Sequence, residues 1–152
     1  MLLGMLTLEP VTPENYDATL ALTVAPDQAS FVAPVVKSLA DAWVWREGAI
    51  PLAAIEDGAV VGFVLLYYPF EAEGSDHITL VRFMVDAQHQ RRGLGAALIT
   101  ETMDHARALV PRPSRMKLSV MPENGGAQRL YERFGFAGIE IEDDERVMWR
   151  DL

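Results

Sequence analysis

Apolar and polar positions along the chain predict a series of short strands. Alternating or continuous apolar runs of strand length recur through the sequence, and such runs are typical of strands that pack against a core. The predicted strands cover residues 6–9, 52–56, 60–68, 77–85, 117–120, 139–142 and 146–149. Asp57 and Gly58 join two of these strands and are typical of a tight hairpin turn.

Apolar residues spaced three and four apart predict the helices. The predicted helices cover residues 13–24, 34–46, 93–110 and 125–134. Thr12 and Pro13 supply the cap and first-turn residues of the first helix, and Gly48 and Gly135 follow the second and fourth helices. The order β-α-α-β-β-β-α-β-α-β-β predicts an α/β (α+β) fold, in which helices flank a mixed sheet.

The second helix contains two tryptophans with different predicted environments. Val35, Val36, Leu39 and Trp43 share one helical face, so Trp43 is expected to pack in the core. Trp45 lies on another face, and it is a candidate aromatic wall for a cationic substrate.

Composition and charge limit the classes of function. The 152 residues are 50% hydrophobic, which is enough to bury the core of a single domain over residues 1–152. Cysteine is absent, which excludes disulfides and a cysteine nucleophile. The net charge of -9 argues against a nucleic-acid partner and suits a cationic small molecule better. Neither a signal peptide nor an apolar stretch of ~20 residues is present, so a cytoplasmic protein without a membrane partner is expected.

A strand, a glycine-containing loop and an amphipathic helix follow one another around residues 85–95. The loop reads Gln90-Arg91-Arg92-Gly93-Leu94-Gly95. Glycine lets the backbone approach a ligand closely, and the free N–H groups at a helix start favour an anion such as a pyrophosphate. On spacing alone, an alternative is equally supported, in which the two glycines only permit a tight turn and the arginines are solvated.

Two motifs in the second half of the chain match those of one known family. Gln90, Gly93 and Gly95 fill the pattern Gln or Arg, two variable residues, Gly, one variable residue, Gly or Ala. The later motif comprises Pro122-Glu123-Asn124, Ala127, Leu130-Tyr131-Glu132-Arg133 and Gly135-Phe136. Over essentially its whole length, the chain resembles the GNAT family of N-acetyltransferases.

This resemblance implies a GNAT-type, mostly antiparallel central sheet and acetyl-coenzyme A as co-substrate. It implies that a strand backbone pairs with the pantetheine arm, that the glycine loop binds the pyrophosphate and that the later motif contacts the coenzyme. The implied coenzyme-binding residues are Phe83, Met84, Val85, Gln90, Arg91, Arg92, Gly93, Leu94, Gly95, Ala96, Asn124 and Tyr131. Tyr131 is also the implied catalytic residue, a general acid that protonates the departing thiolate. On the residues alone, the apolar face formed with Ala127, Leu130 and Phe134 favours Tyr131 as a core residue.

A finer resemblance concerns the acceptor. Residues 31–34, 38–42 and 82–86 look most like segments of bacterial diamine and polyamine (spermidine or spermine) acetyltransferases. This implies a small-molecule amine that attacks the thioester directly in a ternary complex. A peptide amino terminus, an amino acid or an aminoglycoside is an alternative acceptor. A non-catalytic acyl-coenzyme A-binding module is an alternative of a different class, and a homodimer is compatible with the resemblance.

The base that deprotonates the amine is not assigned from the sequence. Roughly one aliphatic amine in a thousand is the free base at neutral pH, so a base or a water chain is needed. By counting back from Gln90, the strand position that carries a catalytic glutamate in histone-modifying relatives falls near Thr79, which cannot serve. The nearby candidates, each more often a solvated loop residue, are Glu71, Glu73, Asp76 and His77. The acidic residues within 140–145 either attract polyamines or form a solvated turn. His89 and His105 lack spaced partners, so no metal site is predicted.

Overall fold

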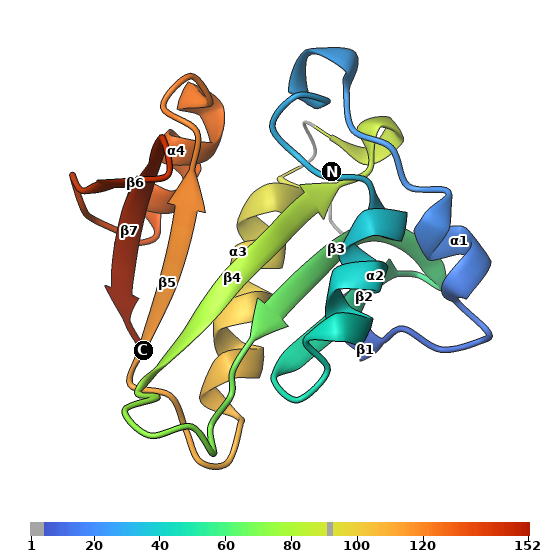
Figure 1. The fold of residues 1–152 in the computed structure, drawn as a ribbon. Coiled ribbons are helices and arrows are strands. Elements are labelled where there is room, and N and C mark those ends of the chain that lie inside the picture. The colour runs from blue at the N-terminus through green and yellow to red at the C-terminus, as the bar shows by residue number, and fades with distance from the viewer. Residues whose placement is uncertain (1–4, 91–92) are drawn as a thin grey trace.

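The computed structural model describes residues 5–90 and 93–152, and its strands form one mixed sheet (Figure 1). The strands lie side by side in the order β1-β2-β3-β4-β5-β7-β6. Their bounds are β1 Leu6–Pro10, β2 Ala49–Glu56, β3 Ala59–Tyr67, β4 His77–Val85, β5 Arg115–Val120, β6 Ile141–Glu142 and β7 Glu145–Asp151. β4 and β5 run parallel, and every other neighbouring pair in the described residues is antiparallel. The prediction of a mixed, mostly antiparallel sheet is confirmed.

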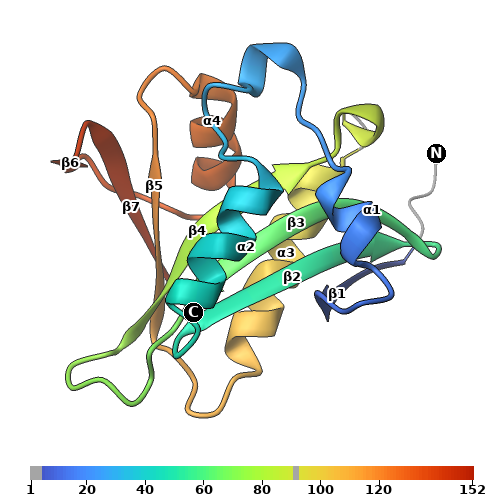
Figure 2. The same cartoon turned by 45° about the vertical axis from the view of Figure 1, so that its right-hand side comes forward.

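Helices cover both faces of this sheet (Figures 1 and 2). α1 (Tyr16–Leu20) and α2 (Val35–Val44) lie on one face, and α3 (Leu94–Arg107) and α4 (Gly125–Arg133) lie on the other. Short 3-10 turns, η1 (Pro26–Gln28) and η2 (Ala87–His89), lie in the connections. Within residues 5–90 and 93–152, no helix is long and apolar enough to span a membrane.

Side-chain alternation along β3 separates two apolar layers. Phe63 and Leu65 pack in the layer formed with α1 and α2, and Val64 and Leu66 pack in the layer formed with α3 and α4. Each of these four residues is at most 3% exposed, and burial of such a side chain contributes about 1.5–3 kcal/mol. β3 is therefore fixed from both faces and gives its neighbour β4 a rigid support.

A β-bulge interrupts the pairing of β4 with β3. Leu66 pairs with Leu80 and Leu65 pairs with Arg82, so Val81 is the additional residue. On its other edge, β4 pairs with β5 only as far as Leu80, opposite Leu118. A bulge bends its strand and increases the local twist, and the two parallel strands diverge beyond this point (Figure 1). The divergence opens the sheet between the second half of β4 and the end of β5, where α3 and α4 flank it.

The first and third helices are shorter than predicted. At the start of the first helix, the Thr12 N–H donates to Asn15 Oδ1 at 2.9 Å, so a turn precedes α1. The helix ends at Leu20 instead of residue 24, because the Thr23 N–H donates to Asp86 Oδ1 at 3.1 Å and is thereby committed to the loop after β4. The third helix ends at Arg107 instead of residue 110. Its last predicted residue directly precedes Pro111, and that position disfavours the helical conformation.

The prediction that Trp43 packs in the core is wrong. Its side chain is 70% exposed, and Val36, predicted on the same buried face, is 63% exposed. The buried face of α2 instead carries Val35, Ser38 and Ala42. The Ser38 hydroxyl donates to the Pro34 carbonyl at 3.3 Å, so this polar group is satisfied within the helix. Small residues therefore face the sheet, and the tryptophan points to solvent.

Candidate active site

The loop that follows β4 is held in place by buried polar contacts. Asp86 is only 8% exposed; besides accepting the Thr23 N–H, its Oδ2 lies 3.1 Å from Nδ1 of His89. The Gln90 side-chain amide donates to the Val85 carbonyl at 3.0 Å and to Gln28 Oε1 at 2.8 Å. The loop is thereby fixed to the end of β4 and to η1. Arg91 and Arg92, which the sequence places in the phosphate site, lie outside the described residues.

The start of α3 presents backbone N–H groups beside this loop. Gly93 caps the helix with φ 76° and ψ 10°, a left-handed conformation that favours glycine. The first N–H groups of a helix lack intrahelical partners and carry partial positive charge, and no acidic residue lies in the first turn of α3. Leu94 is 2% exposed, so its side chain belongs to the core. Its backbone forms the first turn of the helix together with Gly95 and Ala96. The arrangement fits a phosphate group.

The predicted strand residues border the opening between β4 and β5. Phe83, Met84 and Val85 pair with β3 on one edge, and the β4–β5 register ends before them. Met84 packs in the layer of α1 and α2, whereas Phe83 and Val85 pack toward α3 and α4. The Val85 carbonyl already accepts the Gln90 amide. Among the described residues, no strand pairs with the β5-facing edge of this half of β4.

Tyr131 on α4 lies next to this half of β4. Its ring meets the Phe83 ring edge-on at 6.0 Å and the Phe136 ring at 5.9 Å. Its side chain is 7% exposed, and this burial raises the pKa of the Tyr131 phenol above its ordinary value, so the hydroxyl stays protonated at neutral pH. No hydrogen bond among the described residues uses this hydroxyl. Tyr131 is therefore a core residue with a protonated hydroxyl, and its ring packs beside the second half of β4.

Asn124 begins the same helix. Its Oδ1 accepts the N–H of Ala127 at 3.3 Å, so the residue caps α4. The cap uses the carboxamide oxygen and leaves the amide nitrogen as a donor group. The two predicted residues of the later motif thus share one helix, with Asn124 at its first turn and Tyr131 at its last.

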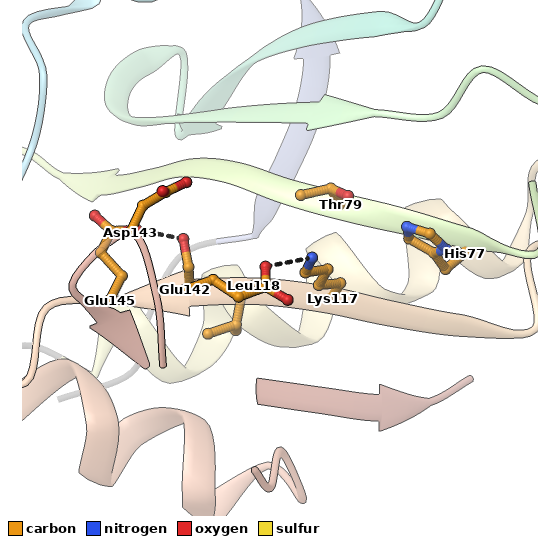
Figure 3. Close-up of a pocket in the computed structure, with 8 residues that line it drawn as sticks. His77, Thr79, Lys117, Leu118, Glu142, Asp143 and Glu145 are labelled. Atoms are coloured by element: carbon orange, nitrogen blue, oxygen red, sulfur yellow. Dashed lines mark hydrogen bonds and ion pairs between the residues drawn. The ribbon is translucent and has the colours of Figure 1, made fainter. Parts of the chain in front are cut away.

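A cavity of about 210 Å³ lies on the face of the sheet away from α3 and α4, because its β4 lining residues His77 and Thr79 alternate with Ile78 and Leu80, which pack toward those helices. Its lining residues come from β4, β5 and the β6–β7 hairpin, and they are His77, Thr79, Lys117, Leu118, Ser119, Glu142, Asp143 and Glu145. The acidic residues lie at one end and His77 at the other (Figure 3). Lys117 Nζ lies 3.1 Å from Glu142 Oε2, and the Ser119 hydroxyl donates to Glu145 Oε2 at 2.5 Å. Three carboxylates and one ammonium, with His77 left out of the sum, give the lining a charge of -2.

The candidate bases from the sequence differ in whether they line this cavity. His77 lines it, together with Thr79, whereas Glu71 and Glu73 are exposed in the β3–β4 connection. Asp76 Oδ1 lies 3.2 Å from His77 Nδ1, and this hydrogen bond is the main cause of the lowered pKa of Asp76. Trp45 is 61% exposed and is not among the lining residues. Within the described residues, no group of three or more His, Cys, Asp or Glu side chains could hold a metal ion.

Comparison with known proteins identifies the family. The acetyltransferase (GNAT) family matches residues 23–136, three quarters of the sequence. The chain belongs to the GNAT family. It is therefore an N-acetyltransferase that uses acetyl-coenzyme A as co-substrate, as predicted. The loop of Gln90 and Gly93 and the helix of Tyr131 both fall within the matched region.

Individual GNAT relatives extend the comparison over the whole chain. The chain is 30% identical to a spermine/spermidine N(1)-acetyltransferase of Bacillus subtilis over 152 residues, which cover 97% of this chain and 99% of that protein. The crystal structure of an acetyltransferase from Thermus thermophilus superposes with a TM-score of 0.76 at 20% identity and covers 100% of both chains. A GNAT acetyltransferase from Elizabethkingia anophelis with acetyl-coenzyme A bound has a TM-score of 0.67 at 17% identity, with 97% and 98% of the two chains covered. These structures show the same fold.

Proposed function

We propose that this GNAT enzyme acetylates a diamine or polyamine. The observation that carries the proposal is the cavity with a charge of -2 beside the β4–β5 opening. Leu118, the last β5 residue paired with β4, belongs to both the cavity lining and the edge of the opening. A linear amine with two ammonium groups matches this charge better than a monoamine does. The 30% identity to a protein named spermine/spermidine N(1)-acetyltransferase supports the same acceptor class.

In this proposal, acetyl-coenzyme A binds on the α3 and α4 side of the sheet, and the amine binds in the cavity on the other side. Acetyl-coenzyme A supplies an acyl carbon that is activated as a thioester. We assign phosphate binding to the loop held by Gln90 and to the N–H groups of Gly95 and Ala96, and pantetheine pairing to the backbone of β4. We assign Asn124 to hydrogen bonding with the coenzyme. Tyr131 donates a proton to the thiolate sulfur as the amide forms.

The acceptor is tested by thiol release from acetyl-coenzyme A with a panel of amines. Putrescine, spermidine and spermine are compared with lysine, an aminoglycoside, a short peptide and a monoamine of equal length. We expect the polyamines to have the highest kcat/KM. Preferred turnover of a peptide or an aminoglycoside would reject the polyamine acceptor. If the protein binds acetyl-coenzyme A but releases no thiol with any amine of the panel, a non-catalytic module would be favoured.

Asp143→Asn tests the contribution of cavity charge. Asp143 lines the cavity with φ 50°, a conformation that asparagine tolerates. We expect the KM for putrescine to rise about threefold with kcat unchanged, because one negative charge is removed from an exposed site. Asp144→Asn is the matched control, since Asp144 also has a positive φ of 66° but is not among the lining residues. Equal effects of the two variants, or an effect that 0.5 M salt does not reduce, would contradict the prediction.

Gln90→Ala tests the anchoring of the phosphate loop. The change removes the bonds to Gln28 and Val85, each worth about 0.5–1.5 kcal/mol. We expect the dissociation constant for coenzyme A, measured by isothermal titration calorimetry, to rise about 5- to 10-fold. Gln88→Ala in the same loop, at an exposed position, is the control and should bind as the unmodified protein does. Unchanged affinity of the Gln90→Ala variant would show that the loop does not depend on this side chain.

A further inference from the structure

The hydrogen bond between Ser119 and Glu145 lies where β5 leaves β4. Leu118 is the last β5 residue paired with β4, and Ser119 follows it directly. The two bonded residues lie 26 positions apart in the sequence and come together through the pairing of β5 with β7. Glu145 is half-buried, and both residues line the cavity. A carboxylate is therefore fixed over the edge of the opening by a contact from the neighbouring strand.

This carboxylate and Tyr131 lie on opposite sides of the sheet. Val120 shares the apolar layer of Tyr131 on the side of α3 and α4. Side chains alternate along a strand, so Ser119 points to the other side, where Glu145 meets it. Acyl transfer from a thioester to an amine requires a proton donor at the sulfur and a proton acceptor at the nitrogen.

The other cavity residues are less suited to accept the proton. Glu142 is paired with the Lys117 ammonium at 3.1 Å. Asp143 is exposed at the tip of the turn. His77 lies at the far end of the cavity, where its ring packs edge-on against Trp149 at 5.1 Å (Figure 3). None of the ion pairs between described residues engages Glu145.

We propose that Glu145 is the general base that deprotonates the acceptor amine, and that Ser119 is the residue that positions it. The inference rests on the proposed amine acetylation. The substrate ammonium transfers one proton to a carboxylate oxygen of Glu145, and the freed lone pair forms the N–C bond as the C–S bond breaks. The thiolate takes a proton from the Tyr131 hydroxyl. The second proton lost by nitrogen restores the phenol, and Glu145 releases its proton to water.

The first test separates a base from an ionic anchor. We expect Glu145→Gln to lower kcat for putrescine at least about 100-fold, to change the KM for putrescine less than about threefold and to leave coenzyme A affinity in calorimetry unchanged. Glu140→Gln is the control, because Glu140 is exposed in the same hairpin but is not among the lining residues. A higher KM with an unchanged kcat would overturn the proposal and leave Glu145 as an anchor.

Chemical rescue provides a second readout. Imidazole at pH 7.5 accepts a proton but cannot form an ion pair with an ammonium group, so it should restore kcat of Glu145→Ala at least about tenfold. Rescue by formate alone, without rescue by imidazole, would overturn the proposal. Ser119→Ala should lower kcat severalfold, and Ser119→Thr, which keeps the hydroxyl, should recover most of that loss. Equal kcat values of Ser119→Ala and Ser119→Thr would show that Ser119 does not position Glu145.

The same experiment distinguishes this inference from the acceptor assignment. If the unmodified enzyme turns over another amine but no polyamine, the acceptor class is wrong, and the Glu145→Gln comparison is repeated with the amine that is used. If the unmodified enzyme turns over putrescine and Glu145→Gln retains its kcat, only the general base is wrong.

Discussion

Replacement of Tyr131 by phenylalanine is expected to lower kcat at least about 100-fold, within the range of 10²–10⁴ that general acid–base groups contribute. The substitution keeps the ring contacts with Phe83 and Phe136 and removes only the hydroxyl. Because burial raises the pKa of the Tyr131 phenol, the native hydroxyl remains a proton donor from neutral pH to pH 9. Titration of Tyr131 should therefore not limit kcat in that range.

The measurement is steady-state thiol release combined with calorimetric binding of coenzyme A. Affinity is expected to stay within about twofold, because the proton transfer is needed only in the reaction. Tyr16→Phe is a suitable control, since Tyr16 is 45% exposed and lies on α1, across the sheet from α4. A normal kcat of the Tyr131→Phe enzyme would show that Tyr131 is a core residue and not the general acid.

The second prediction with a large expected effect concerns the stability of the fold. Phe136→Ala should lower the free energy of unfolding by about 3–5 kcal/mol, a typical cost for truncating a buried phenylalanine. Phe136 is 2% exposed and packs against the ring of Tyr131. This loss is a large part of the 5–15 kcal/mol that stabilises an ordinary domain.

Urea denaturation followed by circular dichroism measures this change. Ile139→Ala is the control, because Ile139 is 89% exposed and its truncation should alter stability by no more than about 0.5 kcal/mol. A loss below 1 kcal/mol for Phe136→Ala would show that the layer around Tyr131 is loosely packed.

Local sequence signals predicted the features that depend on neighbouring residues. The order of strands and helices follows from periodicity, and the position of Gly93 at the start of α3 follows from the glycine loop. The predicted helix of residues 125–134 contains Tyr131 and directly follows Asn124, and α4 has the same arrangement. The acidic residues of the last hairpin are also evident in the sequence, where their role stays open between an attraction for polyamines and a solvated turn.

Features that depend on tertiary pairing could not be predicted in this way. α1 ends early because Thr23 bonds to Asp86, 63 residues away. The rotation of α2, which exposes Trp43, depends on how closely its small residues approach the sheet. Ser119 had no signal of its own, because its partner Glu145 reaches it only through the pairing of β5 with β7.

Val81, the additional residue in β4, changes which side of the sheet the later residues of this strand face. Before Val81, the odd-numbered residues His77 and Thr79 line the acidic cavity. After Val81, the odd-numbered residues Phe83 and Val85 face α3 and α4. The bulge thus reverses the parity of the strand, so that its first half borders the cavity that we assign to the acceptor and its second half borders the site that we assign to the acyl donor. Under these assignments, we expect substitutions at residues 77 and 79 to alter acceptor choice without altering the wall of the donor site, so the two specificities could evolve separately.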